Sequence, residues 1–140
     1  MNEYAVSGPA GITQTSGIEH KRSPLSVNET VNRFVDAARA AGAKVFDVID
    51  HSGEAQHVGL TLRETKLVIF GNPLGGTPAM AASPLTAIDL PLKVLIWEDQ
   101  EGSVWMSYLI PEWLAERHGL DQQLVAPFSA VEKLTAAVAR

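Results

Sequence analysis

Two neighbouring apolar segments constrain the fold of this chain more than any other feature. LKVLIWED (92–99) and SVWMSYLI (103–110) are rich in β-branched and aromatic residues, and a short polar turn that ends at Gly102 joins them. This pattern predicts a β-hairpin. Along the second strand, Trp105 and Tyr108 fall on opposite faces. One face can therefore pack against helices. The other face keeps an apolar surface, which could be part of the ordinary core, line a ligand pocket or contact a partner.

A second strong signal is an amphipathic helix that begins after Ser26. Ser26 and Glu29 fit a capping box, in which each side chain satisfies a backbone N–H at the start of the helix. Gly42 is well placed to end the helix in the left-handed conformation. The apolar residues between them share one helical stripe, which consists of Val27, Val31, Phe34, Val35, Ala38 and Ala41.

The rest of the chain reads as short strands and helices. Strands are expected at 16–23, 43–50 and 67–70, and helical segments at about 52–58, from Thr77-Pro78 onward, at 111–118 and at 127–139. The β-α-β-β-β-β-α-like order predicts an α+β protein. We expect a two-layer sandwich, in which helices cover one face of a curved, mixed or antiparallel sheet.

The composition is that of one globular domain, because 46% of the 140 residues are hydrophobic and 19% are charged. Residues 1–15 are mostly small and polar, so we expect a flexible N-terminal tail followed by a single domain over 16–140. Cysteine is absent. This excludes disulfides, thiolate metal sites and cysteine nucleophiles.

Charge and hydropathy narrow the possible partners. The net charge of −5 argues against nucleic-acid binding, because such a surface repels phosphate backbones. No apolar run approaches the roughly 20 residues that span a membrane, and the N-terminus lacks the basic start and apolar block of a signal peptide. We expect a cytoplasmic protein with neither nucleic-acid nor membrane partners.

The glycine-rich stretch IFGNPLGGTPAM (69–80) resembles a phosphate-binding loop only superficially. A P-loop places a lysine directly after its last glycine, whereas Gly76 is followed by Thr77 and Pro78. We therefore expect no nucleotide cofactor, and we interpret the stretch as a tight turn in which Thr77 caps the next helix. Such a constrained loop can also line a ligand pocket, and the candidates are Gly71, Asn72, Pro73 and Thr77.

The polar residues that follow the strand at 43–50 form the one cluster of possible metal ligands. His51, Glu54 and His57 carry nitrogen and oxygen donors that suit zinc, but on a helix the two histidines point about 120° apart. Asp50 or Glu54 beside His51 would make an acid–base pair if partly buried. An exposed polar turn capped by Asp50 explains the same residues without any chemistry.

Several motifs resemble the bacterial and archaeal family called domain of unknown function 302. They are Gly71-Asn72-Pro73, Thr77-Pro78, Asp89-Leu90-Pro91, Tyr108 with Pro111, and LAERHG (114–119). The resemblance covers residues 16–140 and implies a two-layer α/β domain similar to the TATA-binding-protein-like group, with a homodimer as an unsurprising assembly. It implies no catalytic residues. The segment LRET (62–65) departs from the prolines common there, which puts only that turn in doubt.

We therefore expect an uncharacterised domain that binds a small molecule or forms a structural dimer. The expected ligand-lining residues are Asp50, His51, Gly71, Asn72, Pro73, Thr77, Trp105 and Tyr108. The alternative is a metal-assisted or hydrolytic enzyme centred on Asp50, His51 and Glu54.

Overall fold

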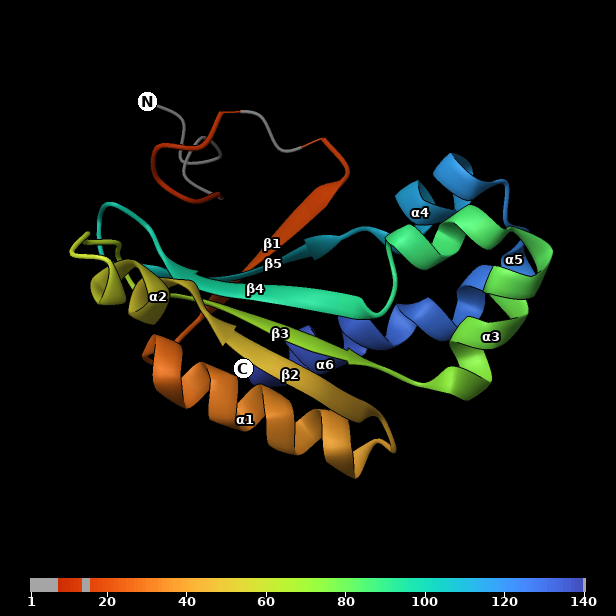
Figure 1. The fold of residues 1–140 in the computed structure, drawn as a ribbon, viewed down its shortest axis with the longest axis horizontal. Helices are drawn as coiled ribbons and strands as arrows, with labels where there is room; N and C mark the ends of the chain where they lie inside the picture. The colour runs from red at the N-terminus through yellow and green to blue at the C-terminus, as the bar shows by residue number, and fades with distance from the viewer. Residues whose placement is uncertain (1–7, 14–15, 140) are drawn as a thin grey trace.

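The five strands form one antiparallel sheet in the order β1-β5-β4-β3-β2 (Figure 1). The computed structural model describes residues 8–13 and 16–139. The strands are β1 (Ile18–Ser23), β2 (Lys44–Asp50), β3 (Thr65–Gly71), β4 (Leu92–Glu98) and β5 (Val104–Leu109). β4 and β5 are the predicted hairpin. β1 and β2 lie at opposite edges of the sheet, so the helix between them must cross the whole sheet.

That crossing helix is α1 (Val27–Ala40), and it begins as the sequence predicts. Ser26 accepts a hydrogen bond from the backbone N–H of Glu29, and the carboxylate of Glu29 accepts one from the backbone N–H of Ser26. The buried stripe of α1 packs on the sheet, where the rings of Phe34 and Phe70 meet edge to face at 5.1 Å. Burying apolar side chains of this size is the main stabilising term in the fold.

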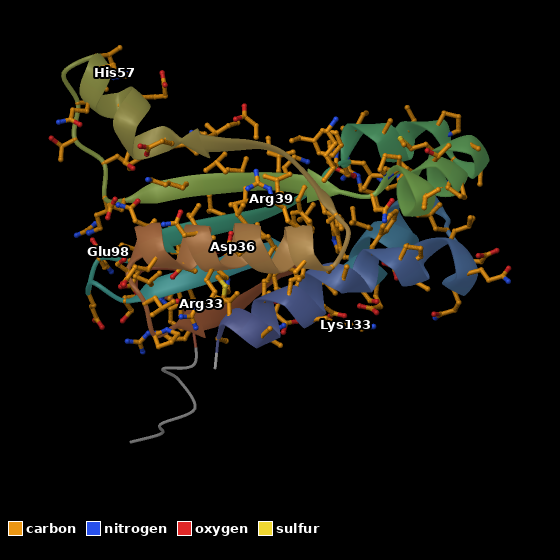
Figure 2. All side chains as sticks on the ribbon, turned by 90° about the horizontal axis from the view of Figure 1, so that it is seen from below. Arg33, Asp36, Arg39, His57, Glu98 and Lys133 are labelled. Atoms are coloured by element: carbon orange, nitrogen blue, oxygen red, sulfur yellow. The ribbon has the colours of Figure 1, made fainter. Side chains whose placement is uncertain are left out.

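The second helix of this layer is α6 (Ala130–Val138), which lies beside α1 (Figure 2). Arg33, Asp36 and Arg39 of α1 and Lys133 of α6 occupy the outer surface of the layer. The shorter helical elements lie toward the ends of the sheet. They are α2 (His51–His57), α3 (Pro73–Ala82), η2 (Pro84–Ile88), α4 (Pro111–His118), α5 (Gln122–Val125) and η3 (Ala126–Ser129).

The predicted α+β architecture is confirmed, and the sheet is antiparallel throughout. Alternation along β5 also follows the prediction. Val104, Met106 and Tyr108 belong to the core beneath the sheet, whereas Trp105 lies on the opposite face. No helix in the described part of the chain lies across that opposite face (Figure 1).

One helix begins earlier than expected. The sequence suggested a turn over 71–76 and a helix capped by Thr77, but α3 already begins at Pro73. The side chain of Asn72 accepts a hydrogen bond from the backbone N–H of Leu74 at 3.0 Å, and proline is favoured in the first turn of a helix. Asn72-Pro73 therefore gives the same start signal as Thr77-Pro78, five residues earlier, and Pro78 lies inside the helix.

The carboxylate of Asp99 joins the hairpin turn to the N-terminal segment. It accepts hydrogen bonds from the backbone N–H of Ala10 and from Nε1 of Trp105, both at 2.9 Å. Its other oxygen accepts from the backbone N–H groups of Glu101 and Ser103 at 2.9 and 3.0 Å. The flexible tail expected over 1–15 lies largely outside the described residues, but its described part is held at Ala10.

We predict that replacing Asp99 with asparagine destabilises the fold. Burial alone raises the pKa of this carboxyl, but the four donors outweigh it and lower the pKa to about 2. An amide cannot accept all four bonds, so we expect a loss on the order of 2–3 kcal/mol in the free energy of unfolding at neutral pH, measured by urea denaturation.

The stability difference between the wild type and Asp99→Asn should also depend on pH. Because the folded pKa lies below the ordinary value of 3.8, the stabilisation is present above about pH 4 and is lost as the pH falls toward 2. The difference between the wild type and Asp99→Asn should shrink over that interval. Asp121→Asn is the matched control, because Asp121 is an exposed N-cap where asparagine serves equally well. Equal losses in both variants would contradict the role of Asp99.

Candidate ligand-binding site

An apolar pocket of about 210 Å³ lies where the end of the sheet, α3 and η3 meet. Its walls come from two strands and two helical segments. Phe70 and Leu92 contribute from β3 and β4, Met80 from α3, and Phe128 from η3. The lining includes no charged side chain. This composition is typical of sites that hold small apolar molecules.

The close approach of α3 to η3 depends on a glycine. A Cβ atom added at Gly75 would lie 2.7 Å from Cβ of Pro127, which is closer than two carbon atoms can pack. A Cβ atom at Gly76 would instead lie 3.6 Å from Leu90 and 3.8 Å from Met80, in ordinary contact. Gly75 therefore brings the two helical segments together, while Gly76 lines the pocket without being required by packing.

The structure gathers half of the expected ligand-lining residues at this pocket. Gly71, Asn72, Pro73 and Thr77 all line it. Asn72, Pro73 and Thr77 are exposed and form part of its rim. The glycine-rich stretch therefore borders a pocket, although it does so as the first turns of a helix.

The other four expected residues lie elsewhere. Asp50 pairs with Lys66, at the end of β2 and β3 remote from Gly71, which pairs with Lys44. His51 follows Asp50 at the start of α2. Trp105 and Tyr108 point to opposite faces of β5, so one side of the sheet cannot present both. The eight residues do not form one site.

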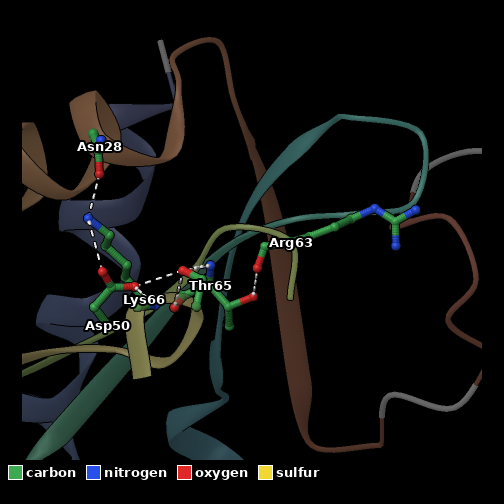
Figure 3. Close-up of polar contacts among 7 residues, drawn as sticks. Asn28, Asp50, Arg63, Thr65 and Lys66 are labelled. Atoms are coloured by element: carbon green, nitrogen blue, oxygen red, sulfur yellow. Dashed lines mark hydrogen bonds and ion pairs between the residues drawn. The ribbon is translucent and has the colours of Figure 1, made fainter. Parts of the chain in front are cut away.

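Asp50 caps α2 (Figure 3). Its carboxylate accepts hydrogen bonds from the hydroxyl of Ser52 at 2.7 Å and from the backbone N–H of Gly53 at 2.9 Å, and Nζ of Lys66 lies 4.0 Å away. The Ser52 hydroxyl and then the Gly53 amide lower the pKa of Asp50. Figure 3 also shows Lys66 in contact with Asn28 of α1. These bonds hold α2 against the sheet.

The three suggested metal ligands lie on α2 with their side chains exposed. His51, Glu54 and His57 share this helix of seven residues. Nowhere in residues 8–13 and 16–139 do three or more histidine or acidic side chains gather in a group that could hold a metal ion. Metal binding by these residues therefore stays a prediction.

Sequence reasoning missed a partly buried polar cluster beside α4. Nε2 of His118 lies 2.6 Å from Oδ2 of Asp89, and Nε of Arg117 lies 3.1 Å from the same oxygen. Only 6% of the His118 side chain is exposed. Arg117 and His118 look like ordinary charges at the end of a helix, and only the motif Asp89-Leu90-Pro91 marks their partner.

A second polar cluster lies on the face of the sheet that helices leave uncovered. Nε1 of Trp97 donates a hydrogen bond to Oγ of Ser107 at 2.9 Å, and Nδ1 of His20 lies 2.6 Å from the same Oγ. Burial lowers the pKa of His20, while Glu19 acts in the opposite direction. The lowered pKa favours the neutral form of the His20 imidazole. Strand alternation predicts on which face of the sheet Ser107 lies, but it does not predict that His20 of β1 is its hydrogen-bond partner.

These observations define an α+β domain with an apolar pocket at the end of its sheet. The family model of the domain of unknown function DUF302 matches residues 19–140, so the chain belongs to this family, as the motifs predicted. A crystal structure of an uncharacterized conserved protein DUF302 from Bacillus stearothermophilus is similar with a TM-score of 0.73. It shares 19% identity over 88% of this chain and 95% of that chain, which supports the fold alone.

Curated relatives are longer than this chain. Over 105 residues, the chain is 43% identical to proteins named fluoride-specific ion channel FluC 1 from Brucella suis biovar 1 (strain 1330) and Brucella abortus biovar 1 (strain 9-941). The match covers 75% of this chain but 41% and 39% of those proteins. The chain thus spans about two fifths of their length. None of the helices in its described part is both long and apolar enough to cross a membrane.

We predict opposite outcomes for alanine at the two neighbouring glycines of α3. Gly75→Ala forces a methyl group against the rigid ring of Pro127 and should lower the free energy of unfolding by about 1–3 kcal/mol. Gly76→Ala meets only ordinary contacts and should be neutral, or stabilising by up to about 1 kcal/mol, because alanine favours helix. Chemical denaturation measures both. Equal effects would show that α3 does not approach η3 as described.

Proposed function

We propose that this domain binds a small, uncharged and largely apolar molecule in the pocket between α3, η3 and the end of the sheet. The observation that carries the proposal is the lining of the pocket, where aromatic and aliphatic side chains predominate and no side chain is charged. A charged ligand would lose its hydration there without gaining an ionic partner. An apolar ligand would gain contact with walls whose few polar groups lie at the rim.

The polar groups at the rim set the orientation of such a ligand. Oδ1 of Asn72 accepts a hydrogen bond from the backbone N–H of Leu74, so the side-chain NH₂ of Asn72 is the group that can turn toward a ligand. The hydroxyl of Thr77 lies at the same rim. One carbonyl or hydroxyl group on the ligand would suit this arrangement, with the apolar body directed inward.

The enzymatic alternative at Asp50, His51 and Glu54 has less support. The Asp50 carboxylate already accepts two hydrogen bonds as the cap of α2, and His51 and Glu54 are exposed. An acid–base pair benefits from a cleft that shields it from water. The longer relatives carry a channel name, but the chain matches only about two fifths of their length, so we do not extend ion conduction to it.

A filled pocket provides the test. Gly76→Leu places a large side chain toward Leu90 and Met80, inside the pocket, whereas Ala81→Leu adds the same side chain on the exposed surface of α3. A panel of neutral apolar metabolites should contain compounds that raise the melting temperature of the wild type and of Ala81→Leu. The same compounds should not raise that of Gly76→Leu. Equal shifts in all three proteins would contradict the proposal.

We also propose that two copies associate through the uncovered face of β2 and β3. Ile49 and Ile69 point away from α1 and are only half-buried. Exposed apolar surface of this kind marks interfaces. Sedimentation velocity should show a dimer of the wild type at high concentration and a monomer for Ile49→Lys. Val58→Lys, at an exposed position after α2, is the control that should remain dimeric. A wild-type monomer would end this proposal.

A further inference from the structure

The strands β4 and β5 part before either of them ends. Their ladder runs from Glu98 and Val104 to Leu95 and Ser107 and does not continue to Lys93 and Leu109. Figure 1 shows the two strands separating toward α4. Each strand nevertheless keeps its outer partner. β4 pairs with β3 as far as Leu92, and β5 pairs with β1 as far as Leu109. The sheet therefore contains a gap between β4 and β5.

A cavity of about 220 Å³ occupies this gap. Leu67 and Leu95 line it from the uncovered face of the sheet, and Tyr108 and Val131 from the helix-covered side. Leu114 of α4 closes one end. The cavity thus reaches through the sheet. It shares Leu92 with the pocket at α3 but is otherwise lined by different residues.

The walls of the gap carry backbone groups as well as apolar side chains. The backbone N–H of Asp99 donates a hydrogen bond to the carbonyl of Ser103 at 2.8 Å. Asp99 and Ser103 are therefore a hydrogen-bonded pair of the ladder between β4 and β5. In an antiparallel ladder such residues alternate along each strand. Every second pair along the two strands is hydrogen-bonded, and this series, continued past Leu95 and Ser107, reaches Lys93 and Leu109. The backbone N–H and C=O groups of Lys93 and Leu109 therefore point into the gap. Backbone groups that lose their ladder partner form a hydrogen bond with another group or with water.

The charge at the α4 end of the cavity favours an anion. Nζ of Lys93 donates to the backbone carbonyls of Pro91 at 3.0 Å and Asp89 at 3.5 Å, and an ammonium group has three protons to donate. The Asp89 carboxylate also lines the cavity, but Arg117 and His118 already pair with it. The ammonium group of Lys93 therefore keeps one proton for an anionic ligand at this end of the cavity.

We infer that the gap between β4 and β5 is a second binding site, which takes a small aliphatic carboxylate. The carboxylate oxygens accept hydrogen bonds from the ammonium group of Lys93 and from the backbone N–H groups at the gap. The aliphatic body lies against Leu67, Leu95 and Ile18. This site differs from the pocket at α3 in place and in the charge of its ligand.

Hexanoate is the probe and 1-hexanol its uncharged counterpart. Titration of the ¹⁵N-labelled wild-type chain should shift the amide signals of Lys93, Leu95 and Leu109 in a saturable way, while those of Gly71 and Met80 stay unchanged. Hexanol should bind about tenfold more weakly, because it lacks the charge-assisted hydrogen bond. Absence of saturable shifts at the gap, or equal affinity for both compounds, would overturn the inference.

Two substitutions isolate the charge of Lys93. Lys93→Met removes the ammonium group, and Lys93→Gln removes the charge but keeps an N–H donor. Both should weaken hexanoate binding about tenfold and leave hexanol binding unchanged, as measured by calorimetry. Lys133→Met alters an exposed lysine on α6 and should leave both affinities unchanged. Unchanged hexanoate affinity in both Lys93 variants would overturn the assignment. If either variant folds poorly, the comparison of hexanoate with hexanol on the wild-type chain still tests the inference.

Discussion

The fold depends on the burial of one face of an antiparallel sheet beneath α1 and α6. Val68, Val94, Ile96 and Met106 are fully buried on that face, and Phe34 reaches them from α1. Each such side chain contributes on the order of 1.5–3 kcal/mol when it leaves water. Because side chains alternate along each strand, the same packing turns the remaining side chains to a face that no described helix lies across. One-sided burial therefore determines where exposed apolar surface is found.

Cavities then arise where the two layers end or where neighbouring strands separate. The pocket at α3 forms where the sheet stops and Gly75 lets α3 approach Pro127. The gap at Lys93 forms where β4 and β5 part while their outer neighbours still hold them. Both features come from backbone geometry. Neither requires an unusual side chain, so no sequence motif marks either cavity.

Much of the fold could be predicted because its signals are local. The capping box of Ser26 and Glu29 and the left-handed Gly119 at the end of α4 each act within a few residues. The start of α3 was misplaced because two Asn/Thr-Pro pairs give the same local signal. The His118–Asp89 contact joins residues 29 apart. The end of a strand ladder leaves no local mark, so Lys93 could not be identified as part of a site.

The two cavities are chemically distinct, and this difference limits what each one accepts. An ionised ligand would lose hydration in the pocket at α3 without gaining an ionic partner, because no charged side chain lines it. The gap at Lys93 offers an ammonium group and backbone amides beside leucine side chains, which is the arrangement that an aliphatic acid needs. A chain with a net charge of −5 holds few anions by long-range attraction. An anion bound here is therefore held by local contacts, and its affinity depends on Lys93 rather than on the charge of the whole protein.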